Sequence, residues 1–157
     1  MAILVTGGAG YIGSHTTVEL LKKGYEVVVM DNLYNASKIA LDRVEQITGK
    51  KVKFYEVDMR DKEADRKIFQ ENNIDCVIHF AGMKAVGESV RIPLDYYDNN
   101  IGGTITLLEV MKEFNVKTIL FSSSATVYGG KATVPFYEDS PLGVTKPYGA
   151  TKLMIEH

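Results

Sequence analysis

The chain has 157 residues, of which 45% are hydrophobic and 24% charged, and its formal net charge is −2. This composition excludes intrinsic disorder, and the weak acidic balance gives no reason to expect a nucleic acid or an anionic membrane as a partner. No apolar run reaches about 18 residues, and no basic region with a long apolar one opens the chain. We therefore expect neither a membrane span nor a secretory signal.

Cysteine and histidine usage limits the chemistry further. Cys76 is the only cysteine and lies inside an apolar run, so we expect a small core residue in a reduced, cytoplasmic setting rather than a nucleophile. The three histidines, at positions 15, 79 and 157, have no metal-ligand spacing. No metal site is expected, and the length is that of one ordinary domain.

The first predicted elements are a strand, a glycine turn and a helix. An apolar run from Ile3 leads into Gly7, Gly10 and Gly13, and a helical pattern begins near Tyr11. Glycine bends the backbone sharply and removes side chains that would hold a phosphate away, while the helix presents unpaired N–H groups to an anion. The spacing is G-x-x-G-x-x-G rather than G-x-G-x-x-G, so an ordinary glycine-rich turn is the alternative to a pyrophosphate site.

A second strand, from Glu26 to Met30, ends at Asp31. An acidic residue at this strand end lies where the ribose of a bound dinucleotide is held. A carboxylate there accepts hydrogen bonds from the 2′- and 3′-hydroxyls and repels a 2′-phosphate, which favours NAD over NADP. The alternative is a strand-end aspartate that binds no ligand.

The rest of the chain continues the alternation of helices and strands. Helices are predicted over 37–48, over 61–72 with Asp61 at its start, over 93–114 with a break near Asn99, and from Tyr148 onward. Strands are predicted over 52–57, 75–80 and 117–121, and residues 125–146 read as a long loop. The apolar helix faces are expected to be Leu41, Val44 and Ile47 in one helix and Ile101, Ile105 and Leu108 in another.

Five strands alternating with helices predict an α/β fold, a doubly wound parallel sheet of the Rossmann-like kind, with residues 1–157 as one domain. Ligands of such sheets bind at the carboxyl ends of the strands. The features at those ends are the glycine turn, Asp31, Asp58, Phe80-Ala81-Gly82 and Ser122-Ser123-Ser124.

The last helix carries Tyr148-Gly149-Ala150-Thr151-Lys152. Residues four apart share a helix face, so the phenol of Tyr148 and the ammonium of Lys152 are expected to point the same way. A cation beside a phenol favours the phenolate, which makes tyrosine a general base near neutral pH. The hydroxyl of Ser124 would bridge Tyr148 to a substrate alcohol. The alternative is a chance pair, since any helix can contain Tyr and Lys at this spacing.

Longer motifs point to a family. The segments Thr6–His15, Asp31–Leu33, His79–Ser89, Tyr96–Asn100 and Phe121–Gly129, together with Tyr148-x-x-x-Lys152, resemble the UDP-galactose 4-epimerase family of the extended short-chain dehydrogenase/reductase superfamily. The resemblance runs along the whole chain. The segments around Lys84 and around Ser124 are more specific than the glycine turn.

The resemblance implies a role for each matching residue. Tyr11 and Ile12 lie at the pyrophosphate of NAD, beside Gly7, Gly10 and Gly13. The adenosine ribose is held by Asp31, Asn32 and Asn35, and the adenine by Asp58 and Met59. The nicotinamide side is lined by Phe80, Ala81, Gly82, Lys84, Asn99 and Lys152. Tyr148 is the catalytic base, with Ser124 and Lys152 as the other catalytic residues, and Lys84, Ser124 and Tyr148 contact the substrate.

The resemblance also implies the reaction. Tyr148 takes the proton of the sugar C4 hydroxyl while hydride moves from C4 to NAD, the keto sugar turns over, and hydride returns to its other face. UDP-galactose and UDP-glucose are interconverted, and NAD is regenerated in place. Full-length members of the family are expected to form a homodimer.

Three alternatives stay open. The first is a 4,6-dehydratase. The family of such enzymes has an Asp-Glu pair after the fifth strand, where this chain has Ala125 and Thr126, which offer no acid or base. The second is an epimerase acting on UDP-glucuronate or a UDP-N-acetylhexosamine, which is harder to exclude than the dehydratase. The third is an NAD-binding fragment without turnover, because family chains are longer and their C-terminal part supplies the uridine diphosphate site. We therefore expect a C-terminally truncated domain without the substrate domain, and exposed apolar surface that favours self-association.

Overall fold

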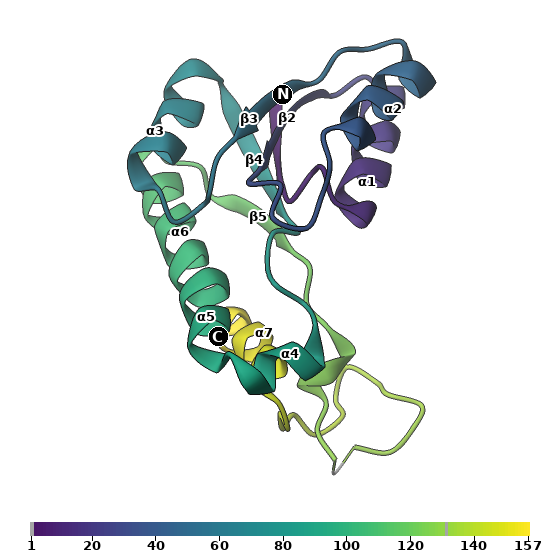
Figure 1. The fold of residues 1–157 in the computed structure, drawn as a ribbon, viewed down its shortest axis with the longest axis vertical. Helices are drawn as coiled ribbons and strands as arrows, with labels where there is room; N and C mark the ends of the chain where they lie inside the picture. Colours follow the sequence, from purple (N-terminus) through teal and green to yellow (C-terminus); the bar gives the residue numbers. More distant parts are fainter. Residues whose placement is uncertain (1, 131) are drawn as a thin grey trace. The chain divides into compact units, whose positions relative to one another are not determined.

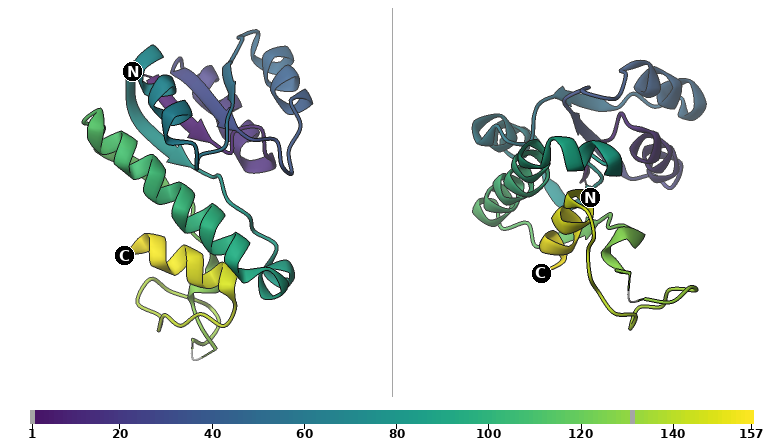
Figure 2. Two further views of the ribbon diagram at one scale, coloured as in Figure 1. Left: turned by 60° about the vertical axis from the view of Figure 1, so that its left-hand side comes forward. Right: turned by 60° about the horizontal axis from the view of Figure 1, so that its bottom comes forward.

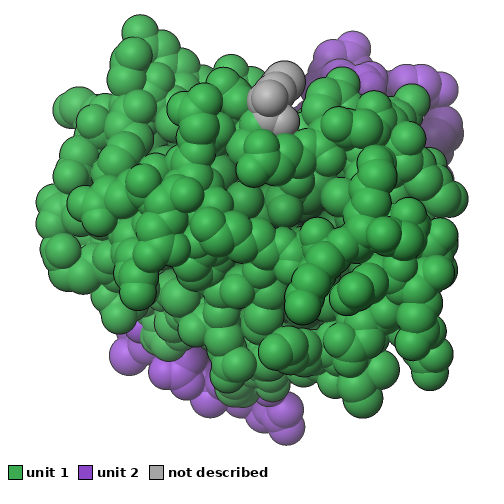
Figure 3. Space-filling view, turned by 90° about the horizontal axis from the view of Figure 1, so that it is seen from above, with its two compact units in different colours: residues 1–81, 105–122 green, residues 82–104, 123–157 purple. Residues whose placement is uncertain are grey.

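The computed structural model describes residues 2–130 and 132–157. The chain divides into two compact units, coloured green and purple in Figure 3. Unit 1 contains the residues through Ala81 and Ile105–Ser122, and unit 2 contains Gly82–Thr104 and Ser123–His157.

Unit 1 is built on a five-stranded parallel sheet in the order β3-β2-β1-β4-β5 (Figure 1). Its strands are β1 (Ala2–Thr6), β2 (Glu26–Asp31), β3 (Lys53–Glu56), β4 (Ile74–His79) and β5 (Thr118–Phe121). Thr6, the last residue of β1, lies opposite Met30 of β2 and His79 of β4, so the carboxyl ends of the three strands meet at one edge. The predicted doubly wound parallel sheet is confirmed.

Helices cover both faces of this sheet. The pair α1 (Tyr11–Lys22) and α2 (Ile39–Thr48) lies on one face, and α3 (Lys62–Glu71) lies with the unit 1 part of α6 (Gly103–Glu113) on the other (Figure 2, right). Successive side chains of a strand point to opposite faces. Ile3 and Val5 therefore pack in one apolar cluster with α1 and α2, and Ala2 and Leu4 pack in a second cluster with α3 and α6.

Two predicted helix faces differ from the observed core faces. Leu41 and Val44 of α2 are buried as expected, but Ile47 is 62% exposed. In α6, Ile105 and Leu108 are 53% and 43% exposed. The buried face of α6 is Leu107, Val110 and Met111, whose spacing of three and four residues gives an equally good stripe one position away. Periodicity alone does not choose between two adjacent apolar stripes.

Unit 2 is mainly helical. It contains α4 (Val86–Arg91), α5 (Pro93–Tyr96), the π-helix η1 (Tyr97–Gly102), the 3₁₀ turn η2 (Ala125–Val127) and α7 (Pro147–Glu156). Within the unit, α7 packs against α4, α5, η1 and η2 (Figure 1). The predicted break near Asn99 is confirmed as η1. Sequence reasoning missed α4, because six residues are too few to show a period.

Candidate functional site

The glycine turn follows β1 directly. Gly7 has φ +67° and donates its N–H to Met30 O at 2.8 Å. A Cβ at Gly7 would lie 2.7 Å from Ala81 N, and a Cβ at Gly13 would overlap Gly7 O. Both positions therefore require glycine. Gly7 needs it for its positive φ and its close contact with Ala81, and Gly13 needs it because α1 approaches the turn closely there.

No side chain caps the start of α1. The N-cap residue is Gly10, which has no side chain to accept from the first N–H groups of the helix. Those N–H groups and the positive end of the helix dipole are suited to an anion. Tyr11 and Ile12, the first residues of α1, are 76% and 49% exposed. The predicted pyrophosphate residues thus lie together in one turn of unit 1.

Asp31 ties the end of β2 to this turn. Its side chain is buried, Oδ2 accepts from Ala9 N at 3.0 Å, and Oδ1 accepts from Leu33 N at 2.9 Å. Each carboxylate oxygen has capacity for a second hydrogen bond, so Asp31 is able to accept from two hydroxyls of a ribose.

Asn32 and Asp58 form a second polar group beside Asp31. Asn32 Nδ2 donates to Asp58 Oδ2 at 3.1 Å, and the Arg60 guanidinium donates to both Asp58 oxygens at 2.9 and 2.8 Å. The Arg60 hydrogen bonds hold the pKa of Asp58 well below its usual range, so this carboxyl is ionised. Met59, by contrast, is 5% exposed and its side chain belongs to the second apolar cluster. Asn35 is exposed in the loop after β2.

A buried polar pair that sequence reasoning did not assign supports the end of β4. Thr6 Oγ1 and His79 Nδ1 lie 2.6 Å apart, and both side chains are fully buried. Ala81 N donates to Thr6 Oγ1 at 3.3 Å, and Phe80 N donates to Thr6 O at 3.1 Å. The pair therefore fixes the backbone of two predicted nicotinamide residues. The sequence feature that could have indicated this pair is a polar residue, Thr6 or His79, at the end of each of two apolar strands.

In unit 2, Tyr148 and Lys152 are both buried on one face of α7, at 8% and 6% exposure. Burial, with a smaller contribution from the charge of Lys84, lowers the pKa of Lys152 to about 8. The ammonium is still charged at neutral pH, so α7 presents a phenol and a cation on the same face. Lys84 itself is exposed.

Asn100 of η1 connects the segment after β4 to α7. Its Oδ1 accepts from Met83 N at 2.8 Å, and its Nδ2 donates to Met83 O at 2.9 Å and to Thr151 Oγ1 at 3.1 Å. Thr151 Oγ1 in turn donates to Tyr148 O at 2.7 Å. Asn99 is joined to the same network, because its Nδ2 donates to Asn100 Oδ1 at 2.9 Å. Sequence reasoning did not assign Asn100 or Thr151.

Ser124 is the N-cap of η2. Its Oγ accepts from Thr126 N at 3.2 Å and from Thr126 Oγ1 at 3.0 Å, which leaves the serine proton available as a donor. Gly149 keeps α7 near η2, since a Cβ there would lie 2.9 Å from Thr126 O. Ser124, Tyr148 and Lys152 thus belong to one compact unit, which contains a hydroxyl, a phenol and a cation.

Other kinds of site are not found in the part of the chain that the structure describes. Across residues 2–130 and 132–157, no group of three His, Cys, Asp or Glu side chains is arranged to hold a metal ion. Over the same residues, no helix has the length and apolar character needed to cross a membrane.

The fold and these residues agree with a family assignment. The chain belongs to the family whose model is described as GDP-mannose 4,6 dehydratase, which matches residues 4–157. Within it, the chain is 65% identical to a UDP-glucose 4-epimerase of Bacillus subtilis (strain 168) over 99% of its length, and 58% identical to one of Dictyostelium discoideum over 98%.

Solved structures agree with the curated relatives. The chain is similar to the UDP-glucose 4-epimerase from Bifidobacterium longum in complex with NAD+ and UDP, with a TM-score of 0.98 and 58% identity over 99% of this chain and 47% of that one. The chain covers 46% of the Bacillus subtilis protein and 45% of the Dictyostelium discoideum protein. It therefore spans about half the length of the curated relatives it matches.

Proposed function

We propose that this chain carries the cofactor-binding and proton-transfer residues of an NAD-dependent UDP-glucose 4-epimerase, which interconverts UDP-galactose and UDP-glucose. The observation that carries the proposal is the pair Tyr148 and Lys152, buried on one face of α7 with Lys152 still charged at neutral pH. The relatives named as UDP-glucose 4-epimerases, at 55–65% identity, support the particular reaction.

NAD fits the residues of unit 1. The turn is closed to any side chain at Gly7 and Gly13, and the N-terminus of α1 has no side-chain cap. We assign the pyrophosphate to this turn and the adenosine ribose to Asp31, with Asn32 and Asn35 beside it. Adenine is assigned to Asp58 and to the backbone of Met59, since the Met59 side chain is buried in the core. NAD held by these residues would supply a reversible hydride acceptor for C4 of the sugar.

The residues of unit 2 move the proton. Tyr148 removes the proton of the C4 hydroxyl, and the charge of Lys152 stabilises the phenolate and holds the nicotinamide ribose. The Ser124 hydroxyl donates a hydrogen bond to the C4 oxygen, which aids the transfer of the C4 hydroxyl proton to Tyr148. Lys84 and Asn99 complete the nicotinamide side with Gly82, and Phe80 and Ala81 contribute from the end of β4.

The described geometry favours epimerisation over dehydration. Water elimination needs an acid and a base beside the tyrosine, and the positions after Ser124 are Ala125 and Thr126. Thr126 is occupied in hydrogen bonds with Ser124. Neither side chain titrates near neutral pH, so neither can serve as the acid or the base that 4,6-dehydration, the reaction named in the description of the family model, requires.

The remaining assignments rest on sequence composition and on the family. We propose one NAD-binding domain over residues 1–157, a cytoplasmic location, and a homodimer in full-length members of the family. A UDP-sugar is the proposed substrate, and no nucleic acid or membrane partner is proposed.

The experiment is to measure NAD in the purified chain by mass and absorbance and then to add UDP-galactose to the same sample. Retained NAD with formation of UDP-glucose supports the whole proposal, and Tyr148→Phe serves as the inactive control. Retained NAD without turnover supports the cofactor assignments and contradicts catalysis by these 157 residues alone. Absence of NAD after incubation with excess cofactor contradicts both.

A further inference from the structure

Asp65 is a buried carboxyl with no partner. It is the fourth residue of α3, its side chain is 0% exposed, and neither carboxyl oxygen has a hydrogen-bond partner among the described residues. Buried aspartates are ordinarily paired or hydrogen-bonded, because an ionised carboxylate without a partner is strongly destabilised away from water. Asp65 has no part in the function proposed above.

The helix face around Asp65 is apolar. Ile68 and Phe69, three and four residues further along α3, share its face and belong to the second apolar cluster of unit 1. The neighbouring strands β1 and β4 contribute Leu4 and Val77 to that cluster, and α6 contributes Leu107, Val110 and Met111. Nothing among these cluster members donates a hydrogen bond to a carboxylate.

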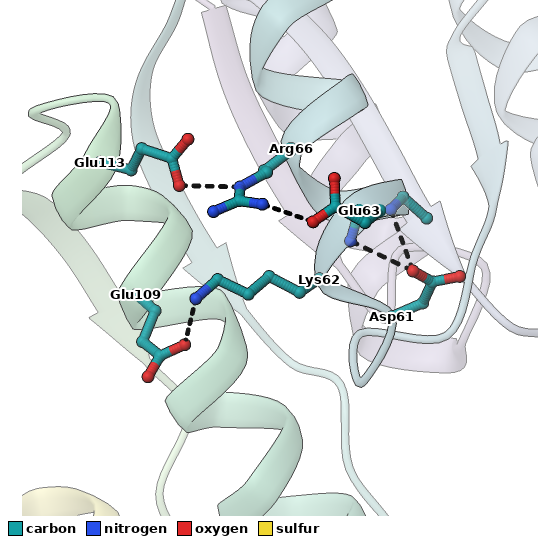
Figure 4. A network of polar contacts seen from close by, with 7 residues as sticks. Asp61, Lys62, Glu63, Arg66, Glu109 and Glu113 are labelled. Carbon is teal, nitrogen blue, oxygen red and sulfur yellow. Dashed lines mark hydrogen bonds and ion pairs between the residues drawn. The ribbon is translucent and has the colours of Figure 1, made fainter.

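The charged groups around α3 do not neutralise Asp65. From the turn before the helix, Asp58 and Asp61 act on it with like charge, and Arg60 is bonded to Asp58. From α6, Glu109 bonds Lys62 and Glu113 bonds Arg66, so both cations are drawn toward α6 (Figure 4). Burial, together with Asp61 and Asp58, raises the pKa of Asp65 to about 8.

We propose that Asp65 is a pH-sensitive switch, which keeps α3 packed on the apolar cluster while its carboxyl is neutral and releases the helix when the carboxyl ionises. A carboxylate at this position gains water only if the helix moves. The helix has ten residues, and helices of that length depend on tertiary packing for their stability. Release exposes Ile68 and Phe69 with Asp65.

The direction of the pH dependence follows from linkage. Aspartate in an unfolded chain ionises near about 3.9, whereas folded Asp65 keeps its proton to about 8. Between these values the folded state binds one proton more than the unfolded state, so stability falls as pH rises. The unfolding equilibrium constant should rise by up to about tenfold per pH unit in this window, or about 100-fold between pH 5 and 7. Above pH 8 this group adds no further change.

Urea unfolding of the whole chain from pH 4.5 to 9 tests the switch with three proteins: the unaltered chain, Asp65→Asn and Asp42→Asn. The exposed carboxyl of Asp42, on α2, makes the last a matched control for removing one acidic group. The unaltered chain and Asp42→Asn, which both keep Asp65, should lose stability in parallel as pH rises. Asp65→Asn should lack the part of this loss that comes from ionisation of Asp65. Asp65→Leu is the second variant if the amide fails to fold.

Two measurements on the unaltered chain locate the effect without any variant. The carboxyl carbon resonance of Asp65 should titrate with a midpoint near pH 8. Amide protection factors in α3 should fall across the same range, while those in α2 stay constant. A midpoint near 4, or an Asp65→Asn profile parallel to that of the unaltered chain, would overturn the proposal.

Discussion

The carboxylate of Asp31 accepts a hydrogen bond from Ala9 N at 3.0 Å, and this bond joins the end of β2 to the glycine turn after β1. The other oxygen accepts from Leu33 N, so one side chain positions the backbone on both sides of the proposed ribose site. Leu33 has φ +57°, a conformation that is rare for a branched side chain, and its hydrogen bond to Asp31 helps to hold it there.

Replacing Asp31 with asparagine should weaken NAD binding by about 10- to 100-fold, which corresponds to the loss of about 1.5–3 kcal/mol from a charge-assisted hydrogen bond. An amide nitrogen cannot accept from Ala9 N or from a ribose hydroxyl. Isothermal titration calorimetry with NAD measures the change, and Asp42→Asn is the control. Equal affinity in both variants would contradict the assignment of Asp31 to the ribose.

Two glycines in helices should respond oppositely to alanine. Gly13→Ala places a Cβ against Gly7 O and Gly8, and overpacking of this kind destabilises by about 1–3 kcal/mol. Gly87 in α4 has nothing within 4 Å of a Cβ, so Gly87→Ala should stabilise by up to about 1 kcal/mol. Thermal unfolding distinguishes them. A Gly13→Ala protein as stable as the unaltered chain would show that α1 does not need this close approach.

The hydroxyl of Thr6 should be worth more than its methyl group. Thr6→Val removes the partner of His79 Nδ1 and of Ala81 N, and buried polar groups left without a partner destabilise by about 1–3 kcal/mol. Thr6→Ser should retain most of the stability in urea unfolding. The exposed Thr118 of β5 provides the control, and Thr118→Val should be close to neutral. Equal loss in the valine and serine variants would contradict a role for the hydroxyl.

Lys152 should titrate near pH 8 in the folded chain instead of near 10.5, because burial and the charge of Lys84 disfavour its ammonium form. Lys84→Gln should raise the midpoint without restoring it fully, since burial remains. Nuclear magnetic resonance of the lysine Cε carbons follows the titration, with Lys112→Gln on α6 as control. Between these two pH values the folded state binds fewer protons than the unfolded state, so this group's contribution to stability rises with pH. An unshifted midpoint in Lys84→Gln would exclude the coupling.

The fold was predictable because its signals are local. Apolar runs of four to six residues, separated by helical periods, identify parallel strands covered on both faces, as β1 and β2 show. Asp61 was recognised as the start of α3, and its Oδ1 does accept from Glu63 N and Ala64 N at 3.2 and 3.1 Å. The position of Asp31 at the carboxyl end of β2 was also predictable, since it follows from the length of the apolar run before it and not from distant residues.

The contacts that support the proposed site were not predictable, because they join residues far apart in the chain. Thr6 and His79 meet only through the register of β1 with β4, which no local pattern specifies. Asn100 of η1 donates to Thr151 of α7, which lies 51 residues further along the chain. Asp65 was missed for another reason: α3 is rich in charged residues, which makes the position look solvent-exposed, and only packing shows that it is buried. The roles of the individual site residues stay predictions until a ligand is bound.

The place of β1 in the sheet has a consequence for biosynthesis. Among the described strands, β1 is synthesised before the others and lies at the centre of the sheet, and His79, the β4 residue opposite Thr6, lies 73 residues after it. At roughly 5–20 residues per second, β1 waits roughly 4–15 s for that neighbour. During this interval the backbone N–H and C=O groups on that edge of β1 have no partner strand. Until β4 is made, the central strand is therefore exposed to pairing with other chains, and this exposure ends only when β4 docks beside it.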